Sequence, residues 1–205
     1  MTLFTAEEEQ RVSETISQAE RTTSGEIVVV VAAKSDTYLY VPPLIAALVS
    51  LFVPWPLIYF SSFTAETVYL IQLVVFLVLT VVLLPMPVRT ALVPRQVKHR
   101  HAHRRAVEQF QVQNLYTTTG NTGVLIFVSV AERHAEILAD AAIDARVPAG
   151  TWDKIVTDLA ATIGKGQPAD GLVAAIVAVG AHLTEAFPPE TRNPNELPDH
   201  LIVLQ

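Results

Sequence analysis

Three carboxylates and one arginine lie close together in the second half of the chain and could do chemistry. They are Glu136, Asp140 and Asp144, with Arg133 just before them as a contact for an anion or a partner. Asp140 is expected where a short strand ends, and small α/β sheets commonly bind ligands in loops at strand ends. Carboxylate oxygens suit Ca²⁺ or Mg²⁺, and either ion could polarise a phosphate ester. The alternative is that these residues are solvated loop charges and that Asp140 caps a turn, because the calcium-loop pattern is absent.

A second group of chemically capable residues is a basic stretch that contains three histidines. His99 and His103 are four residues apart, so on a helix they share a face, as two metal ligands could. No third ligand is identifiable from the sequence, and the neighbouring arginines would repel a cation. We therefore expect a basic surface that faces anionic lipid headgroups. It comprises Arg95, Lys98, Arg100, Arg104 and Arg105.

Composition excludes several functional classes. The net charge of -6 gives no electrostatic support for nucleic-acid binding. The chain has no cysteine, which rules out disulfides, thiolate zinc sites and cysteine nucleophiles. The patterns GxSxG, HExxH and GxxxxGK[ST] are also absent.

Glu26 opens a predicted strand, where we expect it to pair with a basic neighbour at the sheet edge.

The chain that must position these residues contains a long apolar block, residues 38–88. Within it, stretches 41–60 and 67–86 carry no charged side chain, and each could span a bilayer of roughly 30 Å as a helix. Pro54 and Pro56 should kink the first span, because each removes a backbone donor. A buried hairpin of a soluble protein is the alternative, but core helices are rarely so uniformly apolar. The pattern predicts a transmembrane helical hairpin.

The flanking charges predict the orientation of this hairpin. Six basic residues follow the second span between Arg89 and Arg105, whereas the connecting loop at Ser61–Glu66 has no lysine or arginine. The positive-inside rule then puts both termini in the cytoplasm and the loop outside. We expect an inner-membrane protein that crosses the bilayer twice.

Residues 1–37 and 89–189 have the patterns of one α/β domain that the hairpin interrupts. A capping box at Thr5–Glu8 starts a helix, and apolar runs at 27–33, 124–130 and 134–139 indicate strands. Helical spacing covers 96–115 and two later segments. Because the helix at 96–115 connects the first two strands as a crossover, these strands should be parallel. We expect a small mixed sheet with helices on both faces, an α/β/α sandwich. The proline-containing tail, residues 190–205, could add an edge strand through Leu201–Leu204 or dock on a groove.

Several of these stretches resemble the TPM domain family, known from photosystem repair in the thylakoid lumen and from bacterial relatives. They are Thr23 to Val31, Thr122 to Ser129, Glu132 to Asp140, Trp152 to Ile155 and the helix from Gly171 to Gly180. The resemblance implies an α/β/α sandwich and, for some members, phosphatase activity and calcium binding. Two departures are that many relatives are exported and that many carry a glycine-rich stretch where this chain has residues 140–146.

Two functions follow from these patterns. The first is a membrane-anchored TPM-like domain that acts on the cytoplasmic face as a binding or assembly module for membrane proteins. The alternative is a phosphatase, assisted by Ca²⁺ or Mg²⁺, that acts on phosphorylated partners or small phosphate esters. The lipid bilayer and a membrane protein are the expected partners, nucleic acid is not, and the sequence does not define the oligomeric state.

Overall fold

The structure is a computed structural model that describes residues 3–118, 120–189 and 196–204. Its elements are α1 (Ala6–Glu20), β1 (Glu26–Ala32), α2 (Val41–Ser50), α3 (Pro54–Phe60), α4 (Ala65–Leu83), α5 (Met86–Leu92), α6 (Arg95–Val112), the 3₁₀ helix η1 (Leu115–Thr117), β2 (Gly123–Ser129), β3 (His134–Ala139), α7 (Ala141–Asp144), α8 (Thr151–Gly164), α9 (Pro168–Ala186) and β4 (Ile202–Leu204). The chain divides into two compact units, which are described separately.

The first unit, Met1–Ser35 with Lys98–Gln205, is built on a four-stranded sheet of order β3-β2-β1-β4. β1 pairs in parallel with β2 along its whole length and with β4 at Val30–Ala32, whereas β3 is antiparallel to β2. Every residue of β1 and β2 is buried, as their uninterrupted apolar runs predict. The predicted mixed α/β fold is confirmed, and the tail supplies an edge strand.

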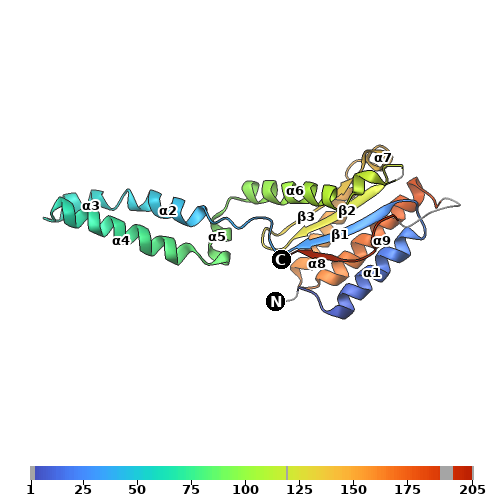
Figure 1. Cartoon of the computed structure of the whole chain (residues 1–205), viewed down its shortest axis with the longest axis horizontal. Coiled ribbons are helices and arrows are strands. Elements are labelled where there is room, and N and C mark those ends of the chain that lie inside the picture. Colours follow the sequence, from blue (N-terminus) through green and yellow to red (C-terminus); the bar gives the residue numbers. More distant parts are fainter. Residues whose placement is uncertain (1–2, 119, 190–195, 205) are drawn as a thin grey trace. The chain divides into compact units, whose positions relative to one another are not determined.

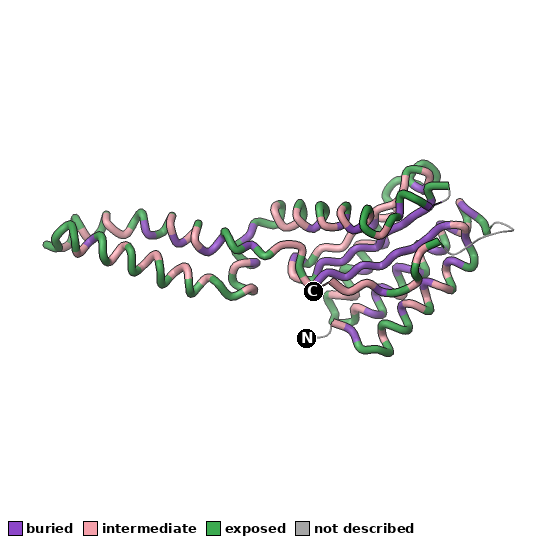
Figure 2. Tube along the Cα trace, viewed as in Figure 1, coloured by how far each residue is buried: buried purple, intermediate pink, exposed green. Residues whose placement is uncertain are grey.

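Alternate residues of β1 and β2 form two separate cores. Ile27, Val29 and Val31 face a core with side chains of α1, α8 and α9, and Val28 and Val30 face a smaller core with α6 and η1. Figure 1 shows α1, α8 and α9 on one side of the sheet and α6 on the other, and Figure 2 shows the central strands as the most buried part of this unit.

Local signals in the sequence account for much of this arrangement. The predicted capping box is present, since Thr5 and Glu8 satisfy each other's backbone donors at the start of α1. In α6, Ala102 and Ala106 are fully buried and let the helix approach the sheet closely. The next residue, Val107, lies on the outer face of this helix and is 38% exposed.

Both connections to the second unit leave the first unit beside the β2–β3 turn. Ser35, which follows β1, donates its backbone N–H to Glu132 of that turn. His99, near the start of α6, has its ring 4.8 Å from that of His134, the first residue of β3. Since His134 pairs with Ser129 at the end of β2, the two connections lie at the same end of the sheet.

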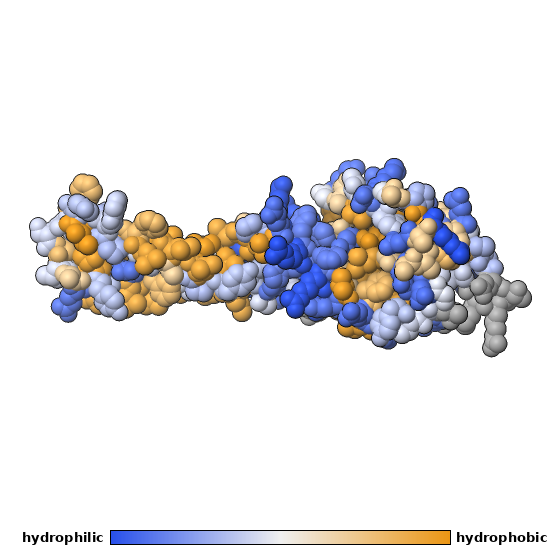
Figure 3. Space-filling view, turned by 90° about the horizontal axis from the view of Figure 1, so that it is seen from above, coloured by the Kyte–Doolittle hydropathy of each residue, from blue (hydrophilic) through white to orange (hydrophobic). Residues whose placement is uncertain are grey.

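The second unit, Asp36–Val97, contains α2, α3, α4 and α5. Residues 51–53 separate α2 from α3, so the first apolar stretch is interrupted just before Pro54, as predicted. α4 packs along α2 and contacts α3. Apolar side chains form most of the surface of this unit, which is predominantly orange in Figure 3.

Three helical segments in the described part of the chain are long and apolar enough to cross a membrane: Val41–Phe60, Ala65–Leu83 and Pro168–Ala186. The first two are the predicted spans. The third, α9, was not predicted to span. Its environment differs from that of the other two, because 44% of its most apolar 18 residues are buried inside the protein. Its Leu172, Ile176 and Leu183 lie in the core shared with α1 and α8.

Candidate functional site

The structure does not bring the three predicted carboxylates together as ligands of one ion. Glu136 lies within β3, Asp140 follows that strand, and Asp144 ends α7. Among the described residues, no group of three or more histidine, aspartate or glutamate side chains is arranged to hold a metal ion. The Ca²⁺ or Mg²⁺ site stays a prediction from the sequence, and we derive no catalytic step through a metal from this arrangement.

Asp140 and Asp144 have local structural partners. The Asp140 carboxylate accepts a hydrogen bond of 2.7 Å from the backbone N–H of Ala141, which places it at the N-cap of α7. This is the capping alternative raised by the sequence. The Asp144 carboxylate lies 3.4 Å from the indole Nε1 of Trp152 in α8. Arg133 is exposed in the β2–β3 turn, with a left-handed backbone (φ 51°).

Glu136 instead lies between two histidines. The Nδ1 atom of His103, in α6, is 2.9 Å from one carboxylate oxygen, and the Nε2 atom of His134 is 3.6 Å from the other. Burial raises the pKa of Glu136, but its contacts with His134 and His103 outweigh this effect, so the net pKa lies below its usual value. The sequence did not predict this cluster, because it depends on the packing of α6 against β3.

The predicted basic residues all lie on α6, but they are not equivalent. Arg105 contacts Glu108 at 3.1 Å and Arg104 contacts the same side chain at 3.6 Å, so these two charges are partly balanced. Arg95 and Arg100 are exposed and Lys98 is half-buried. In the sequence, no acidic residue lies between Glu66 and Glu108, so the region that contains these basic residues has no negative side-chain charge.

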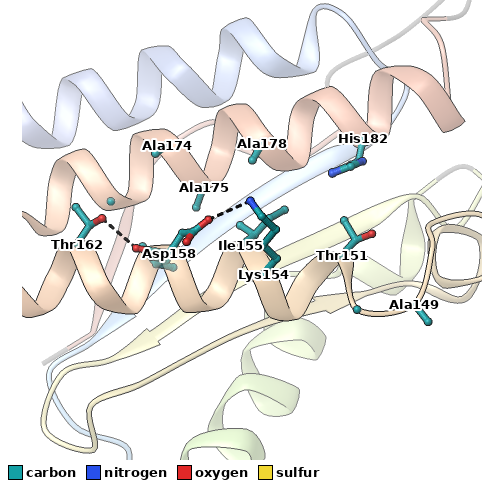
Figure 4. A pocket seen from close by; sticks show the side chains of 13 residues that line it. Ala149, Thr151, Lys154, Ile155, Asp158, Thr162, Ala174, Ala175, Ala178 and His182 are labelled. Atoms are coloured by element: carbon teal, nitrogen blue, oxygen red, sulfur yellow. Dashed lines mark hydrogen bonds and ion pairs between the residues drawn. The ribbon is translucent and has the colours of Figure 1, made fainter.

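A groove of about 490 Å³ lies between α8 and α9. Small residues of α9 form its floor and one wall, and Figure 4 shows Ala174, Ala175 and Ala178 along this side. Gly171 completes the series at helical spacing, which is the sequence signal that could have indicated the groove. Its volume is in the range of ligand pockets, and its mostly small, apolar lining with few polar groups is typical of a binding surface.

The polar groups of this groove come mainly from α8. Lys154 and Asp158 lie 3.4 Å apart, and Thr162 donates to the backbone carbonyl of Asp158 at 3.0 Å (Figure 4). His182 of α9 lies at the other end, with its ring edge-on to Trp152 at 6.4 Å. These groups could orient a bound segment, but they do not form a nucleophile with an adjacent base.

A second polar cluster that the sequence did not indicate lies at the carboxyl ends of β1 and β2. Glu132 is only 4% exposed, and one of its carboxylate oxygens accepts from the Ser35 backbone N–H at 3.0 Å and from the Ser129 hydroxyl. The Ser35 hydroxyl also donates to that of Ser129 at 2.7 Å. This cluster fastens the end of β1 to the β2–β3 turn.

Fold and surface together define a class of protein: a mixed α/β domain whose chain is interrupted by a long apolar helical hairpin. The chain carries a TPM domain, since residues 86–182 match the family model of that description, as the sequence resemblance predicts. No curated protein matches the chain.

A solved structure supports the fold. It is the NMR structure of the BA42 protein from the psychrophilic bacterium Bizionia argentinensis, with a TM-score of 0.61 and 22% sequence identity, covering 98% of this chain and 94% of that one. At this level of identity the likeness concerns the fold alone.

Proposed function

We propose that this chain is a membrane-anchored TPM-domain protein that works as a binding or assembly module for membrane proteins. Residues 38–88 form a hairpin with two spans, and residues 1–37 and 89–189 form a TPM-like domain on the cytoplasmic face. The groove between α8 and α9 is the surface that contacts the partner. The anchor and the groove have separate support, and each has its own experiment.

The observation that carries the anchor is the exposure of apolar side chains along the hairpin. Of the most apolar 18 residues in each segment, only 22% are buried in Val41–Phe60 and only 6% in Ala65–Leu83. Large side chains such as Phe52 (73% exposed) and Val81 (64% exposed) would contact water in a soluble protein. Apolar surface of this extent is stable in the hydrocarbon core of a bilayer, where helices satisfy their own backbone groups.

Charge supports the proposed orientation. The segment between Glu66 and Glu108 has six basic residues and no acidic one, and all six follow the second span. Short segments rich in lysine and arginine stay on the cytoplasmic side. The same residues would attract anionic headgroups, with a contribution of about 1 kcal/mol per basic residue near the surface.

Single-cysteine labelling tests this topology without removing any native thiol, because the chain has none. Ser62→Cys lies in the loop between the spans, and Gln18→Cys lies on the exposed face of α1. In intact cells, an impermeant maleimide should label the first variant and label the second only after the membrane is permeabilised. Equal labelling of both variants would contradict the topology, and release of the protein by alkaline carbonate would contradict the anchor.

Site-specific photo-crosslinking tests the binding surface. A crosslinking side chain at Ala174, at the groove, should give a discrete adduct with a membrane protein in native membranes. The matched control is Ala160, which is also an exposed helical alanine but does not line the groove. Ala178→Trp, which fills the groove, should abolish the adduct from position 174. The same adducts from both positions would contradict a specific surface.

The metal-assisted phosphatase has less support from the geometry, since Glu136 contacts histidines and Asp140 caps a helix. Ca²⁺ and Mg²⁺ titrations of the solubilised protein, read by thermal melting and by phosphatase turnover, test it directly. A metal-dependent rise in Tm and a turnover that are both lost in Asp140→Asn and Asp144→Asn would favour the phosphatase. A binding module should show neither.

A further inference from the structure

Strand β3 presents an open edge of the sheet. The strand order is β3-β2-β1-β4, so β3 and β4 are the two edge strands. All residues of β3 except Ile137 are partly exposed, whereas β1 and β2 are completely buried. β3 contains no proline and no lysine, two residues that often block the edge of a sheet. An edge of this kind can pair with a further strand.

The opposite edge of the sheet is covered by the same chain. β4 pairs with Val30–Ala32 of β1. At the start of β1, the Glu26 carboxylate accepts from the backbone N–H groups of Glu196 at 3.3 Å and of Leu197 at 3.2 Å. Glu26 thus has these backbone donors where a basic neighbour was expected. The free edge of this sheet is therefore that of β3.

Alternate residues of β3 direct their backbone groups to this free edge. The backbone N–H of Asp140 donates to the Gly123 carbonyl at 2.9 Å. Because hydrogen-bonded positions alternate along an antiparallel pair, Glu136 and Leu138 also direct their backbone groups toward β2. The residues that direct theirs outward are Ala135, Ile137 and Ala139. Within residues 3–118, 120–189 and 196–204, nothing forms a hydrogen bond with these outward groups.

The edge is complementary to itself in one antiparallel register. When Ile137 lies opposite Ile137 of a second copy, Ala135 lies opposite Ala139, and every outward N–H and C=O group gains a partner. In this register His134 lies opposite Asp140, so an imidazole donor faces a carboxylate acceptor. No like charges lie directly opposite each other. The pattern favours a second copy over an unrelated strand.

This register also places both copies of α6 on the same face of the joined sheet. Its twofold axis is perpendicular to the sheet, and α6 lies on one side of the sheet (Figure 1). Arg100 and Arg104 of α6 are exposed. The basic residues of both copies can therefore face one bilayer, which two anchored copies in the same membrane require.

We propose that the chain forms a homodimer in which the outer edges of two β3 strands pair antiparallel, with the twofold axis at Ile137. The two sheets then become one continuous sheet, with β4 at each end. This interface is separate from the groove between α8 and α9, so the proposal stands or falls independently of the partner expected there.

Sedimentation of the full-length chain in detergent, over a range of protein concentrations, tests the dimer. Ala135→Pro removes an outward N–H that the chain itself does not use, and proline is tolerated at such edge positions. Each dimer loses one hydrogen bond per copy, so the dissociation constant should rise at least about tenfold. The matched control is Ala6→Pro at the first position of α1, where proline is also tolerated, and it should keep the parent constant.

Hydrogen exchange of single amides tests the register without any substitution. The amides of Ala135, Ile137 and Ala139 should be protected at high protein concentration and exchange rapidly on dilution. Those of Glu136 and Leu138, which bond to β2, should stay protected at both concentrations. Three results would overturn the proposal: a parent chain that is monomeric at every concentration, the same dissociation constant in Ala135→Pro and Ala6→Pro, or outward amides whose exchange is independent of concentration.

Discussion

At the scale of single residues, three buried glutamates accept hydrogen bonds from backbone N–H groups, and one of them also accepts from a serine hydroxyl. Glu132 accepts from Ser35 and Ser129, Glu20 accepts from Ile27, and Glu26 accepts from Glu196 and Leu197. The sequence shows an acidic residue in each case, but not which backbone donor it will contact.

Replacing Glu132 tests the importance of these contacts. In Glu132→Ala, the half-buried Ser35 N–H and the buried Ser129 hydroxyl lose their acceptor, and an unsatisfied buried donor costs about 1–3 kcal/mol. We expect a lower free energy of unfolding of that size, measured by denaturant titration followed by circular dichroism.

Two controls accompany this measurement. Glu132→Gln keeps an acceptor and should cost less than the alanine variant. Arg133→Ala changes an exposed neighbour in the same turn and should stay within about 0.5 kcal/mol of the parent chain. Equal stability of Glu132→Ala and the parent chain would show that the cluster is not important for folding.

At the scale of elements, the sequence predicted the parts whose signals are local. The strand at His134–Ala139 was predicted with its observed limits, and the other two long strands within one residue of theirs. The interruption before Pro54 and the cap at Thr5 were also predicted, because each depends on a few neighbouring residues. The short helices α5 and α7 were not predicted, since segments of 7 and 4 residues give little periodicity.

The candidate sites were harder to predict for a physical reason. Glu136 and His103 are 33 residues apart, and they meet only because α6 crosses the sheet above β3. The groove between α8 and α9 likewise depends on how two helices pack. A single sequence gives the faces of each helix but not which faces meet, so the expected metal ligands were grouped by their spacing alone.

Packing of α1 against α9 depends on one glycine. A Cβ atom at Gly180 would lie 2.9 Å from the Cβ of Ala19, too close for the two helices as they stand. We expect Gly180→Ala to destabilise the protein by about 1–2 kcal/mol, despite its better helix propensity, because overpacking outweighs that gain. Thermal melting measures the difference.

Gly164 of α8 is the matched control. A Cβ atom at this position would meet nothing within 4 Å, and the residue is also helical. Gly164→Ala should therefore be neutral or stabilising by up to about 0.5 kcal/mol. If both variants melted at the same temperature, the close approach of α1 and α9 would not limit this position.

At the scale of the whole molecule, the free energy of unfolding should depend on pH, because Glu20 binds a proton in the folded chain. The folded chain holds a proton on Glu20, whose pKa of about 9 is above the ordinary value of 4.5. At a pH between 4.5 and 9, the chain must release this proton when it unfolds. The contribution of Glu20 to stability is therefore complete below pH 4.5 and declines as the pH rises to 9.

Thermal melting across this range measures the coupling. The parent chain should melt at a lower temperature at pH 8.5 than at pH 6. In Glu20→Gln this part of the pH dependence should disappear, leaving the variant relatively more stable at pH 8.5. Parallel melting curves for the two proteins would mean that Glu20 does not hold a proton in the folded state.

Because both connections leave the first unit at the same end of the sheet, we expect that the hairpin can be deleted without disturbing this unit. Ser35 and His99 are both anchored at the β2–β3 turn, so a short flexible linker in place of residues 36–97 should close the chain without altering the parallel pairing of β1 and β2. Such a deletion should yield a protein that stays in solution without detergent and has an unchanged sheet signal in circular dichroism. The insertion of a hairpin at this one position therefore adds a large apolar surface to the chain without changing the order of the strands in the sheet.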